Sequence, residues 1–105
     1  MSAVRLSSEA VDELVEAAVW YRARQPGLEL EFLTEVERIL PLIGNAPGSF
    51  PRLLDVPGGL VIRRALFPRF PYAVIFMDLR GEIRVLAVAH AKRRPGYWLD
   101  RVAHE

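Results

Sequence analysis

Arginine is the side chain in this sequence with the most obvious chemical potential. Of the 14 basic residues only Lys92 is a lysine, and nine of the thirteen arginines stand after residue 51. Guanidinium groups stay protonated and bind phosphate or carboxylate groups through paired hydrogen bonds. The chain has two histidines and no cysteine, which excludes thiolate chemistry. The residue types therefore favour recognition of an anion or of an acidic protein surface.

The basic and aromatic residues gather in the second half of the chain. Some lie in or just after a predicted strand, and the others belong to the tail that follows the last strand. Pairing of the strands would bring them to one rim of a sheet, where arginines hold an anion and aromatic rings stack beside them. Neighbouring residues of a strand point to opposite faces, so at most one of Arg63 and Arg64 serves a single site. The predicted target-binding residues are Arg64, Arg69, Lys92, Arg93, Arg94, Tyr97, Trp98 and Arg101.

The sequence predicts no cofactor and no metal site. His90 and His104 are fourteen residues apart, and neither belongs to an HxH or HExxH pattern. Gly58-Gly59 matches no phosphate-binding fingerprint, and no nucleophile elbow of the Gly-x-Ser-x-Gly type is present. Any catalysis would therefore rest on the chain's own acid, base and cationic groups.

Length and composition predict one globular domain over residues 1–105. The chain is 51% hydrophobic and 26% charged, which is a globular composition. Residues 1–51 hold four basic and eight acidic groups, a net charge of −4, whereas residues 52–105 hold ten and five, a net charge of +5. Two interpretations stay open: the basic half binds an acidic partner, or an acidic helix pair and a basic sheet are simply solvated.

Nothing in the sequence predicts a membrane partner or export. The longest apolar runs, such as 73–77 and 85–89, are far shorter than the ~20 residues that a membrane helix needs. The first six residues have no apolar signal-peptide core. We therefore expect a cytoplasmic protein, and the absence of cysteine fits a reducing compartment.

Hydrophobic periodicity predicts a short strand and two helices in the first half. A strand at 4–6 ends at Ser7-Ser8, either of which can cap a helix that starts near Glu9. Pro26-Gly27 ends that helix, and a second apolar period runs from residue 32 to 43, so the helices form a hairpin. Pro41 lies inside the second period and predicts a kink or a frayed final turn.

Three strands follow a loop in the second half. Residues 44–59 are rich in Gly and Pro and predict a loop with no helix or strand of its own. Strands are predicted at 60–66, 72–79 and 83–90, the last two joined by a turn around Gly81. The order is β-α-α-β-β-β, an α+β fold with a helical hairpin packed on a small twisted antiparallel sheet.

The last two strands are apolar on both faces, which a sheet with one wet face would not be. Simple alternation places residues 85, 87 and 89 on one face and 86, 88 and 90 on the other. The helical hairpin can cover one face. The second face needs the Pro-Gly loop, the tail with Tyr97 and Trp98, or a partner chain.

Three blocks together resemble toxins of the RelE/ParE superfamily from bacterial type II toxin–antitoxin modules. They are Arg63-Arg64, Phe70-Pro71-Tyr72, and the run Ala87-Val88-Ala89-His90-Ala91-Lys92-Arg93-Arg94-Pro95-Gly96-Tyr97-Trp98. The apolar patterns of both helices fit the same family, so the resemblance covers nearly the whole chain. It implies a small α+β fold and a cognate antitoxin, usually co-expressed, whose extended segment orders on binding to form a toxin–antitoxin hetero-oligomer.

The resemblance implies two competing activities and leaves open whether the chain is an enzyme. RelE-like members cleave mRNA in the ribosome, and ParE-like members inhibit DNA gyrase. Metal-free RNA cleavage needs a base, an acid and positive charge at the phosphate. Arginine can supply only the charge. The candidate nuclease residues are Arg63, Arg64, Arg69, His90 and Tyr97.

The single lysine departs from the lysine-rich surface of RelE-like sites. His90 also has a structural interpretation, as a hydrogen-bonded group at the end of a strand. A ParE-like toxin that binds gyrase is therefore the first prediction, and a ribosome-dependent endoribonuclease is the second. The third is a degenerate member that binds its antitoxin without being toxic.

Overall fold

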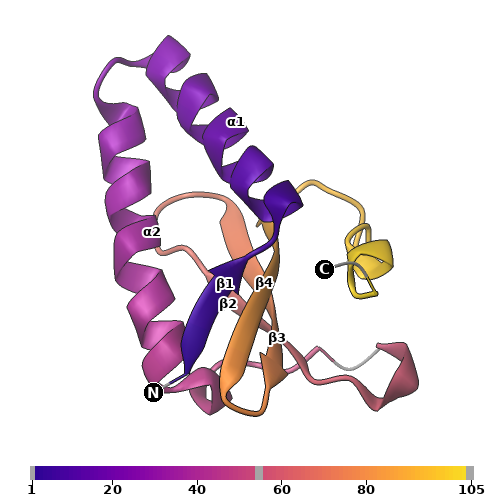
Figure 1. Ribbon diagram of the computed structural model, residues 1–105. Helices are drawn as coiled ribbons and strands as arrows, with labels where there is room; N and C mark the ends of the chain where they lie inside the picture. Colours follow the sequence, from indigo (N-terminus) through magenta and orange to yellow (C-terminus); the bar gives the residue numbers. More distant parts are fainter. Residues whose placement is uncertain (1, 54–55, 104–105) are drawn as a thin grey trace.

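Two helices and four strands follow one another in the predicted order (Figure 1). The computed structural model describes residues 2–53 and 56–103. The elements are β1 (Ala3–Leu6), α1 (Ser8–Arg24), α2 (Leu28–Asn45), β2 (Ile62–Leu66), β3 (Tyr72–Leu79) and β4 (Glu82–His90). The prediction of an α+β fold, with a helical hairpin on a small sheet, is confirmed.

The sheet is mixed, because β1 runs parallel to its neighbour. The strand order is β1-β4-β3-β2, with antiparallel pairing between β2 and β3 and between β3 and β4. β1 pairs in parallel with β4, from Ala3 opposite Glu82 to Leu6 opposite Val85. The prediction of a wholly antiparallel sheet therefore holds for β2–β4 only. The two-helix crossover after β1 is long enough to permit a parallel partner.

Helix α1 begins and ends where capping chemistry allows. The Ser7 hydroxyl accepts the backbone N–H of Ala10 at 3.1 Å, so Ser7 is the N-cap. Arg22 and Arg24 occupy the last turn, where the negative end of the helix dipole stabilises a positive charge. Gly27 then takes a φ of 100°, which glycine adopts without strain, and turns the chain into α2.

Helix α2 continues past its proline. Pro41 lies inside the helix, which runs on to Asn45, so the final turn that the sequence predicted to fray stays helical. Gly44 in that turn lies against the start of β1, because an added Cβ would stand 3.0 Å from the backbone oxygen of Ser2. The Ser2 N–H donates to the Gly44 carbonyl at 2.9 Å. Close packing of this turn against β1 therefore holds the end of α2 in place.

The segment between α2 and β2 is more ordered than the sequence predicted. It contains two short 3₁₀ turns, Pro47–Ser49 and Pro57–Gly59. Arg52 forms an isolated antiparallel bridge with Arg63, and the Leu53 N–H donates to the Ile62 carbonyl at 2.8 Å. The prediction of a loop without structure is thus corrected, since its backbone satisfies part of the outer edge of β2.

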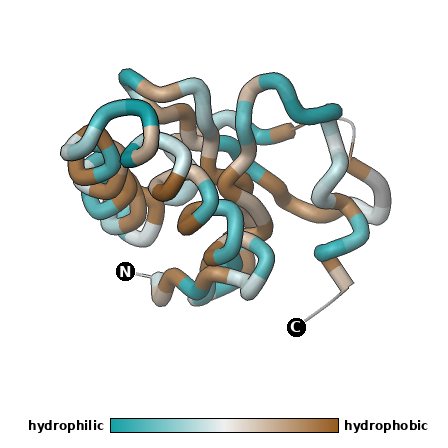
Figure 2. The backbone as a smooth tube through the Cα atoms, turned by 90° about the horizontal axis from the view of Figure 1, so that it is seen from above, coloured by the Kyte–Doolittle hydropathy of each residue, from teal (hydrophilic) through white to brown (hydrophobic). Residues whose placement is uncertain are grey.

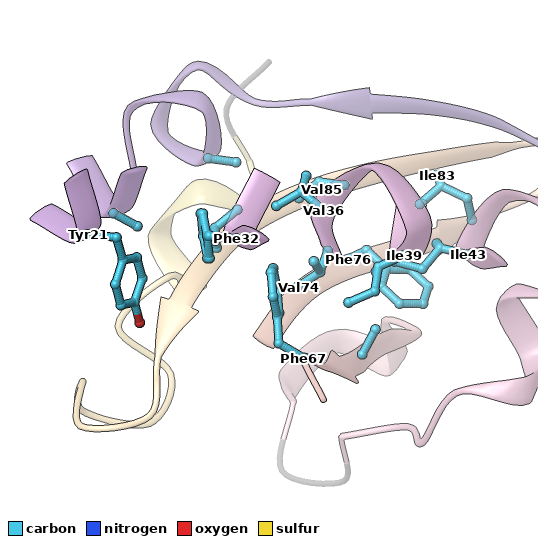
Figure 3. Close-up of a cluster of buried hydrophobic side chains, with 14 residues drawn as sticks. Tyr21, Phe32, Val36, Ile39, Ile43, Phe67, Val74, Phe76, Ile83 and Val85 are labelled. Carbon is cyan, nitrogen blue, oxygen red and sulfur yellow. The ribbon is translucent and has the colours of Figure 1, made fainter. Parts of the chain in front are cut away.

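The helical hairpin covers one face of the sheet with large side chains (Figure 3). Phe32, Ile39 and Ile43 of α2 point toward Val74 and Phe76 of β3. Aromatic rings dominate one end, where Phe32 stacks on Phe67 at a centroid distance of 5.3 Å. We call this cluster the helix-side core.

The C-terminal segment covers the other face. In Figure 1 this segment lies on the opposite side of the sheet from α2. In Figure 2 many of the hydrophobic residues, drawn in brown, lie between the helices and this segment. Trp98 is 5% exposed and packs with Ile62, Ala73, Ile75, Met77, Leu86 and Ala87. Leu53, Val56 and Leu60 of the preceding loop pack against the same cluster. We call it the tail-side core; the chain's own tail and loop supply its cover.

A β-bulge in β4 changes which residues face the helices. Ile75 pairs with Ala87 but the next residue, Phe76, pairs with Val85, so Leu86 is the extra residue. Val85 and Val88 therefore belong to the helix-side core, whereas Leu86 and Ala87 belong to the tail-side core. The simple alternation predicted for β4 is wrong after Leu86, because the bulge reverses the face of every later residue.

Candidate functional site

Glu13 joins α1, β4 and the tail. It lies on the inward side of α1, and its side chain is 13% exposed. Its carboxylate accepts the Val88 N–H at 3.0 Å and the Tyr97 hydroxyl at 2.7 Å. Arg101 donates to both oxygens, at 3.0 and 3.1 Å. We call Glu13, Tyr97 and Arg101 the Glu13 cluster.

This cluster lies where β1 no longer covers the edge of β4. The pairing of β1 ends opposite Val85, so the later polar groups of that edge need other partners. Glu13 accepts the Val88 N–H, and Arg101 donates to the Leu86 carbonyl at 3.0 Å. The carboxylate and the guanidinium thus replace a missing strand, and they fix the tail to the bulge.

Electrostatics fix the protonation states of Tyr97 and Arg101 at neutral pH. Burial raises the pKa of the Tyr97 hydroxyl, and its hydrogen bond to Glu13 raises it further. Burial acts to lower the pKa of Arg101, but the hydrogen bonds and the charge of Glu13 outweigh it and the pKa is raised. Tyr97 therefore stays neutral, Arg101 stays charged, and neither can exchange a proton readily near pH 7.

Cations cover the ring of Tyr97. The guanidinium carbon of Arg93 lies 3.9 Å from the ring centroid and that of Arg101 lies 5.0 Å from it. Such stacking holds the Arg93 guanidinium against the Tyr97 ring and leaves its N–H groups directed outward. Arg93 is exposed, so its charge faces solvent. The tail therefore presents an arginine held in one place.

His90 ends β4 in a structural hydrogen bond. Its Nδ1 accepts the backbone N–H of Lys92 at 3.0 Å, so a neutral ring carries its proton on Nε2. The ring packs edge-on against Tyr72, with centroids 5.0 Å apart. After the bulge His90 shares a face with Val88 but not with Leu86. A proton on Nδ1 would remove the hydrogen bond from Lys92, and the backbone bond from the Arg93 N–H to the His90 carbonyl would remain.

Two of the predicted site arginines are held in ion pairs away from the tail. The Arg63 side chain donates to Asp78 at 3.1 Å and to the Phe50 carbonyl at 2.9 Å. Arg69 donates to the buried carboxylate of Glu35 at 2.9 Å. Glu31 lies 3.2 Å from the same guanidinium. Arg63 and Arg69 therefore tie the loops to the sheet and to α2.

A groove with cationic walls opens beside the tail-side core. It has a volume of about 360 Å³ and lies between the ends of β2 and β4 and the tail. Its lining includes no acidic residue among the described part of the chain. Apolar groups form much of the lining. The polar and charged side chains that line it are Arg64, Arg93, Arg94, His90, Tyr72 and Tyr97, with Trp98 beside them. We call it the tail-side groove.

A second groove lies between α1 and the end of β4. Its volume is about 560 Å³, and it is lined by aromatic rings and by charges of both signs. Trp20 contributes from α1, with Arg24 stacked 4.4 Å from the centroid of its ring. We call it the helix-side groove. It shares four residues with the tail-side groove, namely Tyr72, His90, Arg93 and Tyr97.

The structure thus brings together most, but not all, of the predicted site. Arg64, Arg93, Arg94, His90, Tyr97 and Trp98 line the tail-side groove, and Lys92 lines the helix-side groove. Arg101 lies behind Tyr97 in the Glu13 cluster, and Arg63 and Arg69 stand elsewhere in ion pairs. Sequence reasoning missed Glu13. The available signal was a carboxylate at a core-facing position, between the buried Ala10 and Ala17.

Metal and membrane signals are absent from the described residues. Within 2–53 and 56–103 no three His, Asp or Glu side chains come together as metal ligands. His104 lies outside these ranges. No helix within the same ranges is long and apolar enough to cross a membrane.

Comparison with known proteins shows which solved structure has a similar fold. No protein-family model and no curated protein matches the sequence. A chain in the solved structure of the chromosomal ParDE TA (toxin–antitoxin) system from P. aeruginosa is similar, with a TM-score of 0.72. The two are 23% identical, and the alignment covers 88% of this chain and 98% of that one. This protein has the same fold over nearly its whole length.

Proposed function

We propose that this protein is the toxin of a type II toxin–antitoxin module, acts in the cytoplasm and inhibits its target, DNA gyrase, by binding it. The similarity in fold to a chain of the ParDE TA system supports a toxin of the ParE kind. An exposed cationic groove suits an acidic protein surface as partner.

We favour binding over catalysis because most of the side chains that a nuclease would use are already held in hydrogen bonds or ion pairs. The Tyr97 hydroxyl is bonded to Glu13, and its pKa is raised. His90 accepts a backbone N–H, and Arg63 and Arg69 are ion-paired. Proton transfer by Tyr97 or His90 would have to break their hydrogen bonds, whereas recognition needs only the exposed charges of Arg64, Arg93 and Arg94.

The grooves also suit neutralisation by an antitoxin. Both are open to solvent and carry aromatic rings, and the half-exposed Trp20 borders the helix-side groove. An extended antitoxin segment that fills them would bury this surface and stabilise the toxin by mass action. Co-expression with the adjacent reading frame should therefore raise the melting temperature and the soluble yield. A non-toxic protein that gains nothing from that neighbour would contradict this.

One experiment separates the two activities. Purified protein is added to a gyrase supercoiling reaction and, in parallel, to an in vitro translation reaction in which mRNA cleavage is followed. We expect loss of supercoiling with intact mRNA. A His90→Gln variant should inhibit as well as wild type, because no proton moves.

The ribosome-dependent endoribonuclease is the second candidate, and the tail-side groove is the observation that favours it. His90, Tyr97 and three arginines line one groove, as RNA cleavage would need. In that case His90→Gln should lower the cleavage rate ~10²–10⁴-fold. Inactivity in both assays, with antitoxin binding intact, would instead indicate a degenerate member.

A further inference from the structure

An exposed leucine borders the tail-side groove. Leu66, the last residue of β2, lines the groove and is 65% exposed. Ile62 of the same strand belongs to the tail-side core, so Arg64 and Leu66, at steps of two residues, lie on that face as well. One strand therefore presents a cation and a large apolar side chain side by side, about 7 Å apart along its length.

The backbone of Leu66 faces away from the rest of the sheet. The Phe67 N–H donates to the Tyr72 carbonyl at 3.0 Å, and the Asp78 N–H donates to the Val61 carbonyl at 2.9 Å. Hydrogen bonds alternate along an antiparallel pair, so the odd-numbered residues from 61 to 67 bond toward β3. The N–H and C=O of Leu66 consequently point to the outer edge of β2.

The chain covers this outer edge only as far as Arg64. The Arg64 N–H donates to the Pro51 carbonyl at 3.0 Å, and in the described part of the chain no hydrogen bond reaches the outward groups of Leu66. A partner's peptide backbone carries a matching donor and acceptor, whereas a phosphate group carries acceptors alone. The open backbone beside the groove therefore favours a peptide as its ligand.

The charges of the groove favour an acidic ligand. Arg64, Arg93 and Arg94 are exposed and line the groove, and none forms an ion pair with a carboxylate of residues 2–53 or 56–103. Arg63, the neighbour of Arg64 on the opposite face, is by contrast paired with Asp78. The three cations at the groove are thus available for a partner's carboxylate.

The rings of the tail are poorly placed to bind nucleic acid. Single-stranded RNA binds through bases that stack on open aromatic rings. The guanidinium groups of Arg93 and Arg101 already cover the Tyr97 ring, and Trp98 is 5% exposed. The groove therefore offers arginines, an apolar border and an open backbone, which together suit a protein segment better than a base.

We propose that the tail-side groove binds a short extended segment of the target protein, in which an acidic and a large apolar residue stand two positions apart. The carboxylate pairs with the arginines and the apolar side chain lies on Leu66. The spacing matches Arg64 and Leu66, because side chains of extended chains repeat every two residues. The groove volume of about 360 Å³ suits a few side chains. This proposal rests on the proposed function for the identity of the partner.

A peptide titration tests the groove directly. The probe is the acetylated and amidated peptide Ser-Leu-Ser-Glu-Ser-Leu-Ser, in which leucine stands two positions from glutamate in both directions. Leu-Ser-Ser-Glu-Ser-Ser-Leu has the same composition with a spacing of three. Amide shifts in NMR spectra of the full chain report binding. We expect a Kd on the order of 1 mM for the probe, and at least five-fold weaker binding of the second peptide and of a probe with glutamine in place of glutamate.

Leu66→Thr tests the apolar contact in the protein. Threonine is polar but suits a strand, so the fold should be kept while probe binding weakens at least five-fold. Leu30→Gln is the matched control, because Leu30 is 63% exposed on α2 and lies outside the groove. It should bind the probe as wild type does. The spacing comparison on the wild-type chain decides the proposal even if Leu66→Thr fails to fold.

Three results of the titration would overturn the proposal. The first is an absence of shifts at the groove with 10 mM probe. The second is equal binding of the two spacings, or equal binding of the probe by wild type and a folded Leu66→Thr. The third is a seven-nucleotide single-stranded RNA that binds the groove more tightly than the probe and ignores Leu66→Thr, because phosphate would then be the ligand.

The supercoiling assay separates this proposal from the proposed function. Leu66→Thr should require at least three-fold more protein than wild type for half-inhibition of gyrase, and Leu30→Gln should require no more. Equal inhibition by wild type and Leu66→Thr would overturn the proposal and leave gyrase inhibition intact. A wild-type chain that prefers the probe spacing but leaves supercoiling unaffected would remove gyrase as the target and support the specificity of the groove.

Discussion

The two faces of the sheet are closed in different ways. On the helix side, large rings and branched side chains from two long helices fill the space against β3 and β4. On the tail side, aliphatic residues of β2, β3 and β4 lie beneath one tryptophan, and the segment that carries it is fixed by the Glu13 cluster. The helix-side core depends on buried apolar area, and the tail-side cover depends on one carboxylate as well.

The helix side of the sheet therefore supplies most of the stability, and the tail side carries residues proposed for recognition. Apolar burial is spread over many contacts, so the helix side should unfold only with the whole domain. The tail is held by one buried tryptophan and a few polar contacts, so it should open locally at a lower free energy. Two of the arginines proposed to contact the target, Arg93 and Arg94, lie on this tail. Each prediction below changes one face and leaves the other as a reference.

The largest effect should come from the helix-side core. Phe32→Ala removes a fully buried ring that contacts Phe67, Phe70 and Tyr72, which should lower the free energy of unfolding by about 3–5 kcal/mol. The melting temperature should fall by more than about 12 °C, with one cooperative transition. Leu30→Ala, at a position 63% exposed on the same helix, is the control and should change stability little. A small effect of Phe32→Ala would contradict a helix-side core that depends on buried area.

Glu13→Gln should release the tail. The change removes the charge that faces Arg101 and weakens the bonds to Val88 and Tyr97, at a cost of about 2–3 kcal/mol. Hydrogen exchange should accelerate at the Val88 amide, and Trp98 fluorescence should shift to the red, while amides of α2 stay protected. Glu16→Gln, exposed on the same helix, should do neither. Uniform loss of protection throughout the domain would refute local opening.

Stability should fall in alkaline solution, in part through Tyr97. Its pKa in the folded protein is raised above the ordinary value near 10, so its contribution is complete below pH 10 and is lost as pH rises further. The raised pKa values of Tyr21 and Tyr72 act in the same direction. Tyr97→Phe should make the decline shallower by about 1.4 kcal/mol per pH unit above pH 10. Urea titrations at pH 8–11 measure both slopes, and identical slopes would show that Tyr97 does not titrate with unfolding.

The smallest change in stability should accompany a large change in function. Arg93→Ala with Arg94→Ala removes two exposed charges and one cation–π contact, which costs less than about 1 kcal/mol. Toxicity should drop while the melting temperature stays nearly unchanged. Arg52→Ala with Arg80→Ala removes the same charge outside the tail-side groove and should remain toxic. Full toxicity of the first pair would exclude the tail from the target contact.

The sequence alone was sufficient for the elements, because their signals are local. The four-residue apolar spacing, Ser7 and Pro26-Gly27 predicted the two helices, and β3 was predicted with the bounds that the structure has. Alternation and turn residues depend on neighbours along the chain, so they can be read without the fold. The exposed Arg93-Arg94 pair was identified in the same way, as was the aromatic tail that Trp98 anchors.

Only the tertiary structure decided the parallel pairing of β1, the bulge at Leu86 and the partners of the arginines. Glu13 and Arg101 are 88 residues apart, and Glu35 and Arg69 are 34 apart, so no local pattern links them. A bulge reverses the faces of a strand through its pairing with a neighbour, which single-strand alternation cannot register. The sequence therefore determined which residues are basic, aromatic or apolar. Long-range contacts determined which arginines stay exposed for a partner and which hold the fold together.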